Sequence, residues 1–177
     1  TSVFISDSIH GVYLALLEAG VLVLIVIMLF LQNARALLVP ATTVPVTIIG
    51  AFAAMAALGF TVNLMTLFAL ILAIGIVVDD AIVIVENTSR HIERGLSPRE
   101  AAIRAMDELT GPILGVTLVL TAVFLPASFL PGITGQMFRQ FALVIAATAI
   151  LSALNALTLK PAQCALYLKP RPARRRV

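Results

Sequence analysis

Five long apolar stretches dominate this sequence, at residues 11–31, 38–59, 62–85, 112–131 and 141–160. A helix needs about 20 mostly apolar residues to cross the hydrocarbon core of a bilayer, and each stretch meets that length. Within lipid each stretch has to be helical, because an isolated strand would leave its backbone groups unpaired. The sequence therefore predicts an all-α integral membrane protein with five transmembrane helices.

The composition excludes an ordinary water-soluble domain. Hydrophobic residues make up 60% of the 177 residues and charged residues 12%, whereas soluble domains are about 45–50% apolar and about a quarter charged. Half of the twelve basic residues lie near the C-terminal end, at Lys160, Lys169, Arg171, Arg174, Arg175 and Arg176. The membrane surface explains a basic tail at 171–177 after an apolar stretch, so we expect lipid and not nucleic acid as its partner.

The basic residues outside the apolar stretches indicate the orientation of the chain. If the chain starts outside, eleven basic residues, Lys160 among them, fall inside and only Arg139 falls outside. Loops on the inner side carry the excess of Lys and Arg, so we predict an outside N-terminal end and an inside C-terminal end. The sequence begins without an initiator Met or a signal peptide, so we also expect a segment of a longer protein with at least one span upstream.

The charged loop between the third and fourth stretches carries a helix signal of its own. Residues 97–100, Ser-Pro-Arg-Glu, combine an N-cap serine, a proline at the first helical position and a glutamate that completes a capping box. Ile103, Met106 and Leu109 follow at helical spacing. We expect one short cytoplasmic amphipathic helix here, acting as a solvated connector.

Two adjacent aspartates, Asp79 and Asp80, lie in the third stretch with no basic residue within nine positions on either side. A charged aspartate near the membrane centre costs at least about 2.5–3.5 kcal/mol. Two neighbours cost more, because ionisation of one carboxyl group disfavours ionisation of the other. Such a pair has to be protonated or matched by a cation from another helix. Because a site that alternates between these conditions carries protons, we predict Asp79 and Asp80 as a proton relay.

Other interpretations of the membrane acids stay open. A permanent salt bridge to another helix would make the aspartate pair purely structural. A sodium site normally uses carbonyls of a broken helix, and no Pro or double Gly interrupts the third stretch. Glu18 in the first stretch is a candidate for proton entry, although it could instead snorkel to the interface or bond to a neighbouring helix.

Three further polar features lie at or near the ends of the apolar stretches. Glu86 and Arg90 are one helical turn apart, which predicts an i,i+4 ion pair just beyond the third stretch. Asn63 and Asn155 are lone polar residues suited to hydrogen bonds between helices. With one cysteine, Cys164, and two distant histidines, the sequence predicts no metal site.

Several motifs resemble the resistance-nodulation-division (RND) multidrug exporters of the acriflavine-resistance B type. Residues 31–33 (LQN), 63–68 (NLMTLF) and 73–87 (AIGIVVDDAIVIVEN) are similar to the family's second to fourth transmembrane helices. Residues 134–141 and 159–170 are similar to its sixth helix and the inner end of that helix. The resemblance runs from about Ser8 to Pro170, in the family's order and spacing.

The resemblance implies an efflux pump of the bacterial inner membrane that is driven by the proton-motive force and needs no cofactor. Such a pump is a homotrimer with twelve helices per subunit, and it works with a periplasmic adaptor and an outer-membrane channel. Asp79 and Asp80 match the family's proton-relay aspartates, which indicates the branch that exports hydrophobic and amphiphilic compounds. Glu18 matches an acidic position on the family's second helix.

Some of the family's parts fall outside this sequence. The family's relay lysine lies in the second half of the pump and no lysine precedes Lys160 here, so we expect the cation partner of the aspartates outside this chain. The drug-binding porter domains are also absent, so the substrates cannot be predicted. Residues 171–177 differ from the family's continuation.

Three alternatives belong to other functional classes. The RND-like membrane domain of a protein-export or other non-drug transporter usually lacks the aspartate pair. An intramembrane aspartyl protease takes its two aspartates from different helices, whereas adjacent helical residues point about 100° apart and cannot easily share one water. A structural membrane subunit would keep its function with asparagine in place of both aspartates. We expect a secondary transporter and no enzyme.

The predicted topology can be tested by cysteine labelling in the full-length protein, after Cys164 has been replaced by Ser. A cysteine at Thr61 should react with a membrane-impermeant maleimide added from outside, because we place that loop outside. A cysteine at Ser97 should react only after the membrane is permeabilised. Labelling of position 97 from outside would contradict this topology.

Overall fold

The computed structural model describes residues 34–169 without interruption and, before them, only positions 11, 14, 17, 18, 20–22, 25, 26, 28 and 29. Those earlier positions are helical. The first predicted span, 11–31, therefore lies largely outside the described residues, and the basic tail at 171–177 lies wholly outside them.

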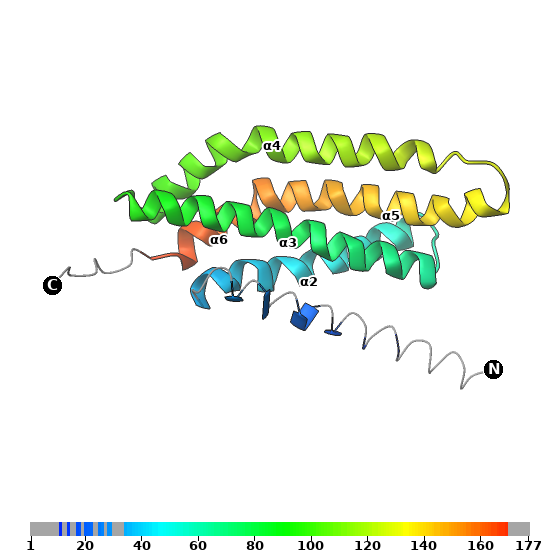
Figure 1. Ribbon diagram of the computed structural model, residues 1–177, viewed down its shortest axis with the longest axis horizontal. Coiled ribbons are helices and arrows are strands. Elements are labelled where there is room, and N and C mark those ends of the chain that lie inside the picture. The colour runs from blue at the N-terminus through cyan, green and yellow to red at the C-terminus, as the bar shows by residue number, and fades with distance from the viewer. Residues whose placement is uncertain are drawn as a thin grey trace.

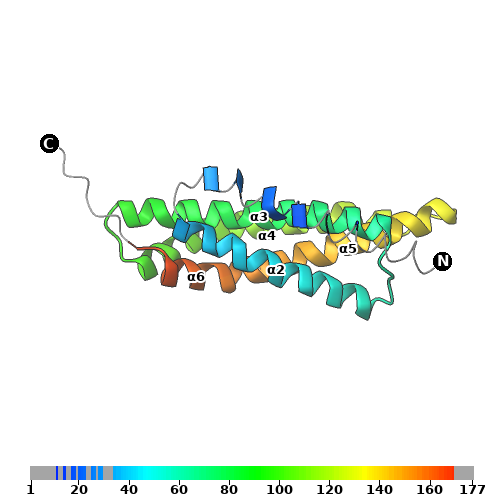
Figure 2. The same cartoon turned by 90° about the horizontal axis from the view of Figure 1, so that it is seen from below.

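Within residues 34–169, five helices form an antiparallel bundle: α2 (Ala34–Ala57), α3 (Leu64–Glu93), α4 (Pro98–Ala127), α5 (Gly132–Leu157) and α6 (Leu159–Tyr167). In Figure 1 the chain runs along the bundle in α2, returns in α3, runs out again in α4 and returns in α5. The α2–α3 and α4–α5 connections lie at one end, and the α3–α4 connection lies with α6 at the other (Figure 1). α3 contacts all four other helices, and Figure 2 shows α6 beside α2.

Four helical segments of the described residues are long and apolar enough to cross a bilayer. They are Arg35–Ala57, Leu64–Glu93, Pro98–Ala127 and Gly132–Tyr167. These segments correspond to the second to fifth predicted spans, and the described residues confirm the all-α class.

Glycine residues end α2 and α3. Gly95 follows the last turn of α3 with φ +98°, in the left-handed region that favours glycine. Its amide donates to the carbonyl of Ile92, and the amide of Leu96 donates to that of His91, which together make a Schellman motif. Gly59, with φ +70°, ends α2 in the same way.

α3 and α5 extend beyond the predicted bounds of their spans. α3 was predicted to end at 85 but reaches Glu93, and α5 begins at Gly132 instead of 141. A helix ends at a residue that breaks it, and the edge of the apolar stretch alone does not end it. The extension of α3 carries the predicted ion pair, because Arg90 Nη2 lies 3.6 Å from Glu86 Oε1.

The prediction of a separate amphipathic helix after Ser97 was wrong, although the predicted capping box is confirmed. The Glu100 amide donates to Ser97 Oγ at 3.4 Å, and the Ser97 amide donates to Glu100 Oε2 at 3.2 Å. The helix that begins there continues as α4 through Pro112 to Ala127. Proline inside a long helix kinks it by removing one backbone hydrogen bond. In Figure 1 the first part of α4 slopes away from α3 before the helix runs along α5.

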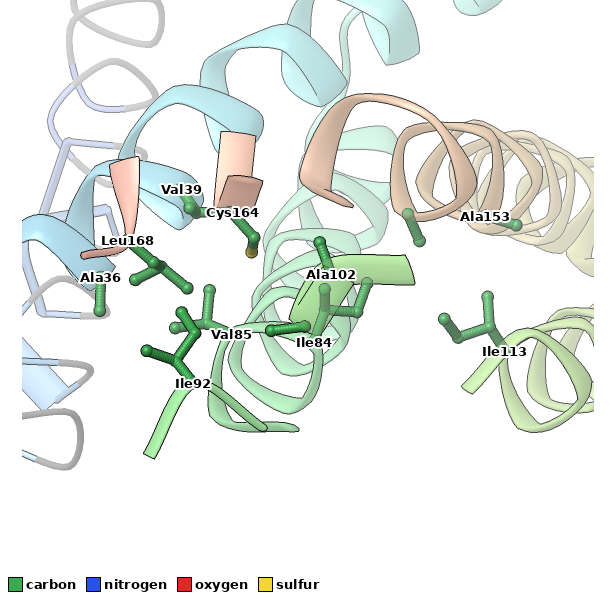
Figure 3. Close-up of a cluster of buried hydrophobic side chains, with 12 residues drawn as sticks. Ala36, Val39, Ile84, Val85, Ile92, Ala102, Ile113, Ala153, Cys164 and Leu168 are labelled. Carbon is green, nitrogen blue, oxygen red and sulfur yellow. The ribbon is translucent and has the colours of Figure 1, made fainter. Parts of the chain in front are cut away.

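Apolar side chains are buried in three clusters along the bundle. The largest lies at the α6 end, where Val39, Ile84 and Cys164 bring α2, α3 and α6 together (Figure 3). A second cluster joins α2, α3 and α5 and includes Met55 and Ile145. A third lies between α2 and α3 and consists of Val44, Ile74, Val77 and Val78. The predicted relay aspartates follow this third cluster directly in the sequence.

Three side-chain amides join α5 or α6 to α2 or α3. The side chain of Asn63, the N-cap of α3, donates to Gln140 of α5. Asn155 of α5 donates to Thr47 of α2 at 2.9 Å. Both predicted interhelical hydrogen bonds are therefore confirmed. Gln163 of α6 also donates to Thr42 of α2, at 2.9 Å, which ties the short helix to the bundle.

The start of α5 yields a stability prediction. A Cβ at Gly135 would lie 1.9 Å from the carbonyl oxygen of Leu130, so a side chain there would force the backbone to move. We expect Gly135→Ala to destabilise the protein by about 1–3 kcal/mol, measured as a lower thermal unfolding midpoint in detergent.

The matched control is Gly115→Ala in α4, where an added Cβ meets nothing within 4 Å. This change should leave stability unchanged or raise it by about 0.5–1 kcal/mol. Equal unfolding midpoints for the two variants would show that the approach of Leu130 to Gly135 does not matter.

Candidate functional site

Asp80 of α3 faces the interior of the bundle, where three helices meet. Its side chain is 19% exposed. Oδ2 accepts a hydrogen bond of 2.8 Å from Ser152 Oγ on α5. The same oxygen lies 3.9 Å from Lys160 Nζ on α6. One carboxylate therefore has a hydroxyl and an ammonium from two other helices beside it.

Lys160 is fully buried, with 0% of its surface exposed. Its ammonium donates a hydrogen bond of 3.1 Å to the carbonyl oxygen of Val77, which precedes Asp80 by three residues on α3. Two expectations from the sequence were therefore wrong. Lys160 is buried and is not one of the basic residues of the inner surface, and a cation for Asp80 is present within this chain.

A helix break positions this lysine. α5 ends at Leu157 and α6 begins at Leu159, with Thr158 between them at φ −121° and ψ −69°. Pro161 has no N–H for the carbonyl of Leu157, four residues earlier, so it ends the regular pattern of α5. Proline is tolerated in the first turn of a helix, and Pro161 occupies that turn in α6. Lys160 is consequently the second residue of a new helix, whose direction differs from that of α5 (Figure 1).

Asp79 has a different environment from Asp80. The side chain of Asp79 is exposed on the surface of the bundle. Adjacent residues of an α-helix point about 100° apart, so only one of the two can face Ser152 and Lys160. A charged aspartate costs too much to face lipid near the membrane centre. The exposed face around Asp79 therefore needs another part of the protein, or a proton, beside it.

The third predicted site residue, Glu18, is not brought to this pair by the described contacts. Glu18 occupies a helical position and is exposed. Its neighbours at 19 and at 15–16 lie outside the described residues. The role of Glu18 in proton entry stays a prediction.

The distances around Asp80 show that its hydrogen bond and its nearest positive charge come from different residues. Charge-assisted N–H···O bonds are about 2.7–2.9 Å long, so the 3.9 Å between Lys160 and Asp80 is a loose ion pair. Ser152 supplies the hydrogen bond, and Lys160 supplies a positive charge. Unit charges at 4 Å attract by about 4 kcal/mol at an effective dielectric constant of 20. Desolvation of a buried ammonium offsets a gain of that size, so the pair is a poor stabilising device.

A second polar cluster lies between α3 and α4, near the end of α3. Asn87 Nδ2 donates to Glu108 Oε2 at 3.0 Å, and His91 Nε2 lies 3.2 Å from Glu108 Oε1. Asn87 and His91 are buried. Within residues 34–169 and the earlier described positions, no three His, Cys, Asp or Glu side chains are grouped to hold a metal ion.

Sequence-based prediction missed Lys160 and Ser152. Lys160 is the last residue of the predicted fifth span, 141–160, so pairing membrane acids with membrane bases could have found it. No comparable signal marks Ser152, because a serine in an apolar helix can equally bond to a carbonyl of its own helix.

The chain matches the AcrB/AcrD/AcrF family over residues 1–177. It is 49% identical over 171 residues to the toluene efflux pump membrane transporter TtgB of Pseudomonas putida (strain DOT-T1E), which covers 96% of this chain and 16% of that relative. It is 48% identical over 171 residues to the multidrug export protein AcrF of Escherichia coli (strain K12), with the same coverage. It is 46% identical to the multidrug resistance protein MdtF of that strain over 173 residues, or 97% of this chain and 17% of the relative. The chain thus spans about a sixth of the length of these curated relatives.

The hydrogen bond at Asp80 can be tested through Ser152→Ala. Loss of a hydrogen bond to a charged group costs about 1.5–3 kcal/mol, so we expect the thermal unfolding midpoint to fall. Ser89→Ala, at a partly exposed serine of α3, is the control and should leave the midpoint unchanged. Equal effects of the two substitutions would show that Ser152 does not hold the carboxylate.

Proposed function

This chain belongs to the AcrB/AcrD/AcrF family, and we propose that it forms part of the membrane domain of a proton-driven efflux transporter. The relatives are named as toluene, multidrug or antibiotic efflux transporters and resistance proteins. The transported compounds are drugs or other amphiphilic molecules. The transporter is a secondary one, a proton antiporter, and catalyses no chemical reaction.

The site at Asp80 carries this proposal. An acid between apolar clusters of a membrane bundle is stable in two forms, neutral with a proton bound or ionised beside a cation. Lys160, 3.9 Å away, and Ser152, 2.8 Å away, are placed to support the ionised form. Asp80 can therefore take up a proton from one side of the membrane and release it to the other. Because the two forms differ in charge, the change can alter how the helices around Asp80 pack.

Asp79 forms the second part of the proposed relay. Its exposed side chain lies on the surface of this bundle, one residue from Asp80. We assign this face to contact with the rest of the same polypeptide, because a charged aspartate cannot remain against lipid. Protons then pass between a carboxylate inside this bundle and one at its boundary.

Membership of the AcrB/AcrD/AcrF family is also the basis for a proposal on the assembly of the complete protein. The complete protein is a multi-pass protein of the bacterial inner membrane, with the N-terminal end of this chain in the periplasm and its C-terminal end in the cytoplasm. It forms a homotrimer with a twelve-helix membrane domain per subunit. A periplasmic adaptor and an outer-membrane channel complete the path out of the cell.

Amide substitution of each aspartate tests the relay. Asp79→Asn and Asp80→Asn keep the size of the side chain but remove its titration, so we expect each to abolish proton-coupled drug efflux by the full-length pump in proteoliposomes. Rates are normalised to the amount of inserted protein. Asp107→Asn, at an exposed aspartate of α4, is the matched control and should export at the parental rate. If either relay variant still exports at the parental rate, that aspartate is not an essential carrier.

A further inference from the structure

Lys160 differs from every other basic residue among those the structure describes, because it alone is fully buried and directed at a membrane carboxylate. We propose that Lys160 is a positioning residue of the proton relay, a fixed counter-charge within this chain that holds Asp80 in its ionised form between proton transfers. This inference rests on the proposed relay function of Asp80.

The first argument is that the charge of Lys160 stays in place whether or not Asp80 carries a proton. The ammonium is bonded to the carbonyl oxygen of Val77 at 3.1 Å, and that oxygen does not titrate. Asp80 and Val77 belong to the same helix, less than one turn apart. When Asp80 is protonated, the ammonium therefore keeps a partner and keeps its position relative to the carboxyl group.

The second argument is that the pair is loose. At 3.9 Å Lys160 stabilises the carboxylate through space, while Ser152 makes the short hydrogen bond of 2.8 Å. A proton can bind to Asp80 without first breaking a tight charge-assisted hydrogen bond. A tight bidentate pair would resist protonation, whereas this arrangement allows both forms.

The third argument is that α6 does not need Lys160 to hold it against the bundle. Gln163 is bonded to Thr42 of α2, and Cys164 and Leu168 lie in the large apolar cluster with side chains of α2 and α3. A structural clamp would therefore be redundant at this position. A buried ammonium is costly to keep for a redundant purpose.

The proton balance of the site is simple. Asp80 binds one proton and its carboxylate becomes a neutral carboxylic acid, so the net charge of the Asp80–Lys160 pair changes from zero to plus one. The other titratable groups near the pair are Asp79, the next residue on α3, and Cys164, one turn further along α6. The group that α5 presents to the carboxylate is the hydroxyl of Ser152, which carries no charge.

The test follows the protonation of Asp80 in the full-length pump by infrared difference spectroscopy. The carboxylic C=O band that Asp80→Asn removes is assigned to Asp80 and is titrated against pH. A cation about 4 Å from a carboxylate favours the ionised form and lowers the titration midpoint by about one to three pH units. In Lys160→Met the midpoint of this band should therefore move upward by about that amount.

Two controls separate charge from other effects. Lys169→Met removes an exposed lysine and should leave the midpoint unchanged. Lys160→Arg keeps the charge and should shift the midpoint much less than Lys160→Met does. A midpoint in Lys160→Met equal to the parental one would overturn the inference.

Lys160→Met could fail to accumulate, because it leaves a carboxylate without its cation. The double variant Asp80→Asn with Lys160→Met then decides the question. Recovery of accumulation supports the counter-charge, because the stranded carboxylate has been removed, and continued failure overturns it.

The test of Lys160 can also be told apart from the test of the proton relay. If Asp80→Asn exports drug normally, the relay proposal fails, whatever the infrared midpoints show. If Asp80→Asn is inactive while the midpoint in Lys160→Met is parental, the relay stands and only the role of Lys160 is lost.

Discussion

Hydrocarbon offers no hydrogen bonds and little solvation for charge, and this constraint governs both the fold and the site. It makes each apolar stretch a helix, because a helix pairs its backbone groups internally. It also leaves the polar side chains of the bundle to satisfy one another, as Asn155 does with Thr47 and Gln163 with Thr42. The same constraint applies to Asp80, whose carboxylate has Ser152 and Lys160 beside it.

Two adjacent aspartates thereby acquire different surroundings from helix geometry alone. The turn of about 100° between successive residues places Asp80 inside the bundle and leaves Asp79 on its surface. The inner carboxylate has a cation from its own chain, whereas the outer one depends on what covers that face. Identical side chains in one short motif therefore have different surroundings.

The lengths of the apolar stretches and the positions of helix-breaking residues made most of the fold predictable from the sequence. Gly59 ends α2 near the predicted position, and the capping box at Ser97 begins a helix where one was expected. Errors arose where the edge of hydrophobicity was taken for the edge of a helix, as at residue 85 of α3. The fourth span was predicted to begin at residue 112, but Pro112 lies inside the continuous helix α4. The aspartates could be located from their charge, whereas the contact of Asp80 with Lys160 was not evident from the sequence. The two residues lie 80 positions apart, and tertiary packing alone brings them together.

The break between α5 and α6 connects a local backbone rule to the electrostatics of the site. Pro161 cannot donate to Leu157, so the chain starts a new helix at the residues that flank the lysine. If α5 continued without a break, the side chain at position 160 would follow the direction of α5 and not that of α6. The contact with Val77 and Asp80 exists in the helix that the break creates. A proline next to the lysine thus determines where the ammonium lies relative to the carboxylate of Asp80.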